Sequence, residues 1–247
     1  SKDFASEFNF FEEEKRAELF SGLYPVTDGD SIVQVLNTNR PNVLLILMEG
    51  FGGVFIEPLG GLPDVAPHLN RLSEEGVFFT NCYANSFRTD RGTVCTLSGY
   101  LGLPTASVMK IPVKSRMLPA LSEEMLKAGY ATDFLYGGDI NFTNMKSYLL
   151  SKGYQKLTAD TDFSLAERTS NVWGVNDDIT ADWLLKQLKE RTGEGRWFTT
   201  YLTLSSHEPF DVPYNRLEDK IPNAFAYTDE CLGKLIDGLK QSEIWKD

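Results

Sequence analysis

Continuous apolar runs of strand length recur along the chain. Residues 43–48 form one such run, bounded by Pro41 before and Glu49-Gly50 after, and residues 131–136 and 197–204 form two more. Apolar runs without polar alternation are typical of strands that are buried on both faces of a parallel sheet. A shorter run at residues 77–79 predicts a further strand.

Helical spacing of apolar residues fills the intervals between these runs. It covers residues 67–75, 178–190 and 222–240, and two further helical patterns end at Gly129 and Gly153. The alternation of strands and helices along the chain predicts an α/β fold, namely a three-layer α/β/α sandwich around a mostly parallel central sheet.

The first 40 residues follow a different pattern. Phe4, Phe8, Phe10 and Phe11 precede the charged run 12–16, which indicates a short amphipathic helix. Pro25 and residues 28–30 then form a turn. We therefore expect an N-terminal arm, residues 1–40, that packs on one domain formed by residues 41–247.

Charge excludes one class of partner. The chain carries 35 acidic and 24 basic residues, a net charge of −11, and has no long basic run. Nucleic acid is therefore not expected as a partner. No stretch approaches the roughly 20 apolar residues of a membrane span, so we expect a soluble globular piece.

Polar side chains follow the predicted strands at their carboxyl ends. They are Glu49, Asp139 and His207, and Thr89 opens a helix after the run at 77–79. Ligands of open parallel sheets bind at this edge. The sequence therefore predicts that an acid, a hydroxyl, a second acid and a histidine converge there.

Thr89 lies between Arg88 and Arg91 at the start of a helix. Helix N-termini favour anions such as phosphate or sulfate, and arginines add charge-assisted contacts. A hydroxyl placed there is suited to attack phosphorus or sulfur. The alternative is that Thr89 or Asp90 only caps the helix and that the arginines are surface residues.

The other candidates also have structural alternatives. Glu49 at the end of a buried strand either binds a cation, which would activate the Thr89 hydroxyl, or forms a salt bridge with a neighbouring arginine. His207 either contacts an anion or bonds to backbone. Asp139 either contacts a polar head group or caps a turn. His68, at a helix start, is expected to be structural.

Three segments resemble a known family. Residues 41–47, 66–81 and 227–239 are similar to sulfatases and their relatives in the alkaline phosphatase superfamily, and the resemblance extends from about residue 40 to the end. Sulfatases place a Cys or Ser in a C/S-x-P-S-R motif and paired aspartates after the first strand. Here the nucleophile position, ten residues before Gly99, is Thr89, and one glutamate, Glu49, replaces the pair. Threonine with one glutamate resembles lipoteichoic acid synthase and related phosphoglycerol or phosphoethanolamine transferases.

The resemblance implies a reaction and a set of site residues. Glu49 and Thr89 would bind a divalent cation, manganese or alternatively zinc, magnesium or calcium. Thr89 would attack the phosphorus of a phospholipid head group, release diacylglycerol and pass the group from a covalent phosphothreonine to an acceptor hydroxyl. His207 would contact that group, with Arg88, Arg91 and Asp139 as further substrate contacts. The enzyme would act on the extracytoplasmic face of a bacterial membrane, anchored by segments outside this chain.

Two departures change what the resemblance implies. Residues 141–146 lack the family's Trp and Arg substrate contacts, so the head group or acceptor is expected to differ. The family's remaining ligands, an Asp-His pair, follow a strand that comes after a helix such as 222–240. We therefore expect the domain to be incomplete at its C-terminus, a part of a longer enzyme that by itself binds metal weakly and is inactive.

Two other functions remain open. One is a sulfatase-like hydrolase that uses Thr89 on sulfate or phosphate esters. The other is a degenerate, non-catalytic domain that binds an anionic glycan or lipid head group.

Overall fold

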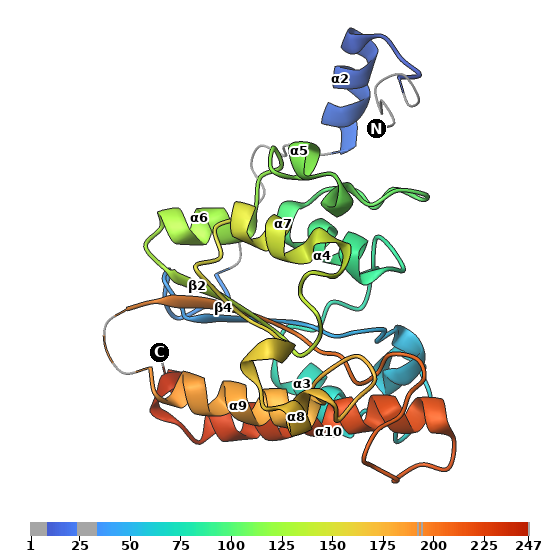
Figure 1. Ribbon diagram of the computed structural model, residues 1–247, viewed down its shortest axis with the longest axis vertical. Helices are drawn as coiled ribbons and strands as arrows, with labels where there is room; N and C mark the ends of the chain where they lie inside the picture. Colours follow the sequence, from blue (N-terminus) through green and yellow to red (C-terminus); the bar gives the residue numbers. More distant parts are fainter. Residues whose placement is uncertain (1–8, 24–33, 192, 194, 247) are drawn as a thin grey trace. The chain divides into compact units, whose positions relative to one another are not determined.

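A four-stranded sheet, all parallel, forms the centre of the domain (Figure 1). The computed structural model describes residues 9–23, 34–191, 193 and 195–246. The strand order is β1-β4-β2-β3, with β1 Val43–Leu47, β2 Ala131–Tyr136, β3 Lys156–Thr158 and β4 Trp197–Leu202. The central strand β4 is buried along its whole length, whereas β1, at one edge of the sheet, is half-buried throughout.

Helices cover both faces of this sheet. In Figure 1, α4, α6 and α7 lie on one side, and α3, α9 and α10 lie on the other. The helices are α3 Pro67–Glu75, α4 Thr89–Ser98, α5 Pro112–Ser115, α6 Leu121–Lys127, α7 Met145–Ser151, α8 Leu165–Arg168, α9 Asp177–Lys189 and α10 Lys220–Lys240. Short 3-10 turns are η1 Gly53–Phe55, η2 Glu57–Leu59, η3 Val108–Lys110, η4 Phe142–Asn144, η5 Asp160–Asp162 and η6 Glu243–Lys246.

Successive strand residues face two separate hydrophobic layers, because side chains alternate along a strand. Phe134 and Phe198 pack in one layer with residues of α4 and α7. Leu135 and Tyr201 pack in the other with residues of α9 and α10. The predicted three-layer α/β/α sandwich with a parallel sheet is confirmed.

Several predicted boundaries differ from the structure. Residues 77–79 were expected to form a strand, but they have no regular secondary structure, and Val77 and Phe79 are 64% and 73% exposed. That prediction is wrong, because no strand of the described residues pairs with this run. α10 begins at Lys220 rather than at residue 222, β4 ends at Leu202 rather than at residue 204, and the short strand β3 was not predicted.

The N-terminal residues form a unit of their own. Residues 1–39 and 40–247 are two separate compact units. Helix α2, Glu13–Leu23, has no buried residue. Phe4, Phe8 and the expected turn at residues 25–30 lie outside the described residues, so the packing of the arm stays a prediction. No helix in the described part of the chain is both long and apolar enough to cross a membrane.

Candidate active site

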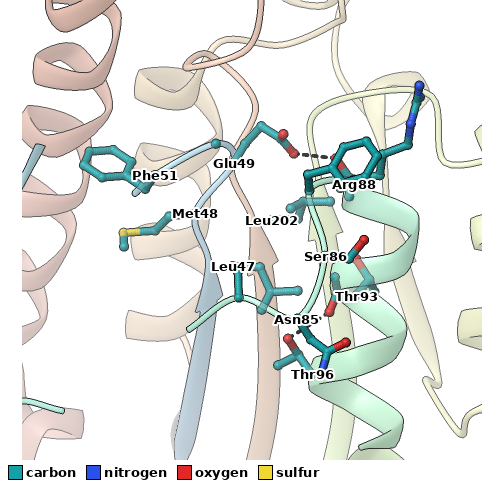
Figure 2. Close-up of a pocket in the computed structure, with 15 residues that line it drawn as sticks. Leu47, Met48, Glu49, Phe51, Asn85, Ser86, Arg88, Thr93, Thr96 and Leu202 are labelled. Atoms are coloured by element: carbon teal, nitrogen blue, oxygen red, sulfur yellow. Dashed lines mark hydrogen bonds between the residues drawn. The ribbon is translucent and has the colours of Figure 1, made fainter. Parts of the chain in front are cut away.

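The Thr89 hydroxyl and the Glu49 carboxylate are directly hydrogen-bonded. Thr89 Oγ1 donates to Glu49 Oε2 at 2.7 Å, and Figure 2 shows this bond reaching from the end of β1 to the start of α4. Thr89 is the first residue of α4, and Glu49 is the second residue after β1. The predicted convergence of these two residues is therefore seen in the structure.

The backbone of Glu49 is fixed by residues that follow β4. Its N–H donates to Thr203 Oγ1 at 2.8 Å, and its carbonyl accepts from Ser206 Oγ at 2.5 Å. The next residue, Gly50, has φ +66°, a conformation that favours glycine. These contacts turn the chain sharply after β1 and hold the carboxylate at the sheet edge.

Helix α4 starts beside the Glu49 carboxylate. Arg88 is the extended residue before the helix, and its carbonyl accepts from the N–H groups of Arg91 and Gly92. The first-turn N–H groups carry the positive end of the helix dipole, which favours negative charge nearby. The structure therefore places Glu49, or an anion in the same space, where the helix stabilises it.

Two hollows meet at the Glu49–Thr89 pair, and Glu49, Phe87, Arg88 and Thr89 line both. The larger hollow, of about 720 Å³, is otherwise lined by residues 47, 48, 50, 51, 84–86, 92, 93, 96 and 202. The smaller hollow, of about 320 Å³, is otherwise lined by Asp90, Lys110, Tyr136, Phe142, Thr143, Met145, Trp173, Thr203, Leu204 and His207.

His207 lies in the smaller hollow and is held by its neighbours. Its Nδ1 donates to the Glu208 carbonyl at 2.8 Å, because a carbonyl can only accept, which leaves Nε2 for other partners. The indole of Trp173 packs edge-on against the imidazole, with ring centres 4.5 Å apart, and donates to the same carbonyl at 2.6 Å. The ring orientation of His207 is therefore set before any ligand binds.

Asp177 organises the loop that carries His207. This fully buried residue accepts the N–H of Leu204 at 2.8 Å, the N–H of Ser205 at 3.1 Å and the hydroxyl of Thr228 at 2.8 Å. Burial raises the pKa of Asp177 above its ordinary value, and these hydrogen bonds oppose the rise. The carboxylate thus joins the start of α9, the end of β4 and the middle of α10.

Tyr136 closes the smaller hollow at the end of β2. Burial raises the pKa of its hydroxyl well above the usual value, and the negative charge of Glu49 adds to the rise. The phenol therefore stays neutral across the physiological range and is available only as a neutral hydrogen-bonding group.

Three other predicted residues lie in different surroundings. Arg88 lines both hollows, but Arg91 donates to the Pro104 carbonyl at 2.8 Å and lines neither. Asp139 also lines neither and accepts the backbone N–H of Asn141 at 2.8 Å, the turn-capping alternative. In the described part of the chain, no ion pair joins Glu49 to Arg88 or Arg91.

His68 is the second residue of α3, and its backbone N–H donates to Asp229 at 3.0 Å. This contact ties α3 to α10 and agrees with the expected structural role. His68 lines neither hollow.

The residues present do not complete a cation site. Glu49 and Thr89 offer two adjacent oxygen atoms, and among the described residues no group of three His, Cys, Asp or Glu side chains could hold a metal ion. Zinc takes about four protein or water ligands and calcium six to eight. The donor set is therefore insufficient for the cation that the resemblance implies.

Sequence reasoning missed four residues of this site: Lys110, Tyr136, Trp173 and Asp177. Asp177 had a signal, since it stands in an Asn-Asp-Asp cluster at a helix start, where such residues are favoured. Lys110 and Trp173 come from short turns and had none. Only the tertiary fold brings them to the sheet edge.

Comparisons with known proteins identify the family and agree with the fold. The chain is 31% identical over 128 residues to an ulvan-active sulfatase of Formosa agariphila, a match that covers 46% of this chain and 21% of that protein. A solved alkaline phosphatase superfamily protein of Vibrio parahaemolyticus is 29% identical, with a TM-score of 0.78, over 86% of this chain and 53% of that one. The lipoteichoic acid synthase LtaP of Listeria monocytogenes shares the fold at 18% identity, with a TM-score of 0.73, over 84% of this chain and 54% of that one.

The chain thus spans about half the length of these two solved structures. The family model described as Sulfatase matches residues 41–247, which include the sheet, both hollows and the hydrogen-bonded pair of Glu49 and Thr89. The protein therefore belongs to the sulfatase family, within the alkaline phosphatase superfamily.

Proposed function

We propose that this protein is part of a transferase that moves a phosphate-linked head group from a phospholipid to an acceptor hydroxyl through a covalent threonine. The observation that carries the proposal is the 2.7 Å hydrogen bond from Thr89 Oγ1 to the Glu49 carboxylate, at a helix N-terminus and at the meeting point of two hollows. A hydroxyl hydrogen-bonded to a base is one arrangement that activates a nucleophile.

The first step forms one bond and breaks another. Thr89 Oγ1 attacks phosphorus, and its proton passes to Glu49, which already accepts the hydrogen bond. The bond from phosphorus to the diacylglycerol oxygen breaks, and that oxygen takes up a proton from water. In the second step the acceptor oxygen attacks the same phosphorus and the bond from phosphorus to Thr89 Oγ1 breaks. The acceptor loses its proton to solvent, and Thr89 Oγ1 regains its proton from Glu49.

The surrounding residues have matching roles. Arg88 lines both hollows and offers donors to the phosphate oxygens, and the N-terminus of α4 adds positive potential. In the described part of the chain His207 Nε2 makes no hydrogen bond, so it is the ring atom available to the head group. We place Arg91 and Asp139 outside direct substrate contact, since they line neither hollow.

We further propose that Glu49 and Thr89 supply part of a divalent cation site that other ligands complete. Such an ion would polarise the ester and stabilise negative charge. We also propose an extracytoplasmic location, with the membrane reached through segments outside this chain. Both proposals rest on the resemblance of the Glu49 and Thr89 positions to transferases of the superfamily.

Intact mass spectrometry tests the reaction. The full-length protein is incubated with phosphatidylglycerol or phosphatidylethanolamine, and a head-group adduct on the wild type is expected. The adduct should vanish in Thr89→Ala and persist in Thr169→Ala, an exposed threonine that lines neither hollow and whose hydroxyl bonds to the Leu165 carbonyl. An adduct that survives in Thr89→Ala would disprove the proposed nucleophile.

Ester hydrolysis is the second candidate, favoured by the 31% identity to an ulvan-active sulfatase. In this case the protein would turn over an aryl sulfate without lipid, and Thr89→Ala would abolish that turnover. Absence of both an adduct and turnover would favour a non-catalytic domain that binds an anionic head group or glycan.

A further inference from the structure

Lys110 forms part of the wall of the smaller hollow and has no role in the steps described above. It ends the η3 turn, Val108–Lys110, and its side chain is about half exposed. In the described part of the chain its ammonium makes no hydrogen bond, and its one ion pair is with Asp90 at 3.8 Å. The ammonium group is therefore available to contact a ligand in the hollow.

Asp90 keeps this ammonium near the nucleophile. The carboxyl group follows Thr89 directly and is 5% exposed. One oxygen accepts the Arg91 N–H at 3.0 Å, while the buried second oxygen has no hydrogen-bond partner. A buried carboxylate oxygen without a donor attracts a nearby cation strongly. The Asp90 carboxylate thus keeps the Lys110 ammonium near Thr89 without forming a hydrogen bond to it.

The backbone of Lys110 is held by an unusual segment. Thr143 and Asn144 both have positive φ, +58° and +63°, which is uncommon for residues other than glycine. Asn144 donates to the Lys110 carbonyl at 3.3 Å, and the Thr143 hydroxyl contacts the sulfur of the buried Met109 at 3.7 Å. Strained backbone persists where the surroundings impose it, often at ligand sites.

We propose that Lys110 is a substrate-binding residue that contacts an anionic oxygen of the ester held against Thr89, and that Asp90 is its positioning residue. The inference rests on the proposed function and extends it. With Arg88 on the same hollow, the site would bind phosphate or sulfate esters that carry an ionised oxygen and would discriminate against neutral esters.

Calorimetric titration of the full-length protein with inorganic phosphate tests the inference without requiring turnover. Lys110→Gln should weaken phosphate binding by about 10-fold or more, the loss expected for one charge-assisted hydrogen bond. Lys110→Arg should stay within about three-fold of the wild type, because the positive charge remains. Lys114→Gln, an exposed lysine four residues away that lines neither hollow, is the matched control and should bind as the wild type does.

Loss of folding is checked separately, since Lys110→Gln removes the cation near the buried Asp90. Thermal unfolding of Lys110→Gln and Lys110→Arg identifies any variant that is not folded, and the arginine variant keeps the charge in place. Unchanged phosphate affinity in a folded Lys110→Gln, or equal losses in Lys110→Gln and Lys114→Gln, would overturn the inference. A wild type that does not bind phosphate would also overturn it.

The two proposals fail in different ways. A Lys110-dependent phosphate site without any Thr89 adduct would support the inference and contradict the transferase. A Thr89 adduct with Lys110-independent phosphate binding would support the transferase and contradict the inference.

Discussion

The hydrogen bond between Thr89 and Glu49 joins two residues that are 40 positions apart in the sequence. Their proximity was predicted, because the residues that follow the strands of a parallel sheet gather at one edge. That reasoning is right for Glu49, but the strand expected at residues 77–79 is absent, and Thr89 reaches the edge as the first residue of α4. The bond itself depends on the tight turn at Gly50 and on Thr203 and Ser206, which hold the Glu49 backbone. No sequence pattern contains that information.

Glu49→Gln tests the role of the carboxylate. The amide keeps the shape and can still accept the Thr89 hydrogen bond, but it is a far weaker base. We predict that the rate of Thr89 adduct formation, measured by intact mass spectrometry, falls by about 10²-fold or more. Glu74→Gln, which changes an exposed glutamate of α3, should leave the rate unchanged. A Glu49→Gln rate equal to that of the wild type would exclude Glu49 as the base.

At the scale of elements, the long helical patterns at residues 178–190 and 222–240 match α9 and α10 closely. The strand predicted at residues 131–136 matches β2. The run at residues 77–79 failed because β-branched and aromatic residues form a strand only when another strand pairs with them. Lys110 and Trp173 were not found, because they lie in short turns positioned by tertiary contacts.

The junction of α3 and α10 leads to a stability prediction. A Cβ atom added at the buried Gly233 would overlap the ring of His68. We predict that Gly233→Ala lowers the free energy of unfolding by about 1–3 kcal/mol in urea titrations, because the two helices must separate. Gly92→Ala is the control, since no atom lies within 4 Å of the added Cβ. This helical substitution should be neutral or stabilising by up to about 1 kcal/mol.

Asp177, at the start of α9, leads to a prediction about pH. The pKa of Asp177 is higher in the folded protein than in the unfolded chain. At pH values between the ordinary aspartate pKa of about 3.9 and the folded pKa, folding therefore takes up a proton. The stability contributed by the protonated form is fully present below that pH and is lost as the pH rises through the folded pKa. Asp177→Asn removes this dependence.

Urea unfolding of the wild type and of Asp177→Asn between about pH 4 and pH 7 checks this sign. The free energy of unfolding of the wild type minus that of the variant should fall as the pH rises. A difference that grows with pH would show that the hydrogen bonds to Asp177 outweigh its burial.

At the scale of the whole molecule, the described residues supply two oxygen ligands for a cation. We predict that this chain binds Mn²⁺ no more tightly than about 10⁻⁴ M, the weak end of the range for oxygen-ligand sites. Calorimetric titration of the chain with Mn²⁺ measures the affinity. A strong anomalous-scattering signal from a fully occupied ion between Glu49 and Thr89 in crystals would contradict the prediction.

The position of β1 at the sheet border affects how the protein behaves in concentrated solution. Its residues, Val43–Leu47, include no charged residue and no proline. On its outer side, no strand of the described residues forms hydrogen bonds with its backbone N–H and C=O groups. Such borders promote self-association, which the net charge of −11 opposes by repulsion. We predict that light scattering of the chain rises with protein concentration and with salt, since salt screens the repulsion. A monodisperse solution at high salt would show that the border is protected. The strand that leads to the proposed base would thus also affect the solubility of the protein.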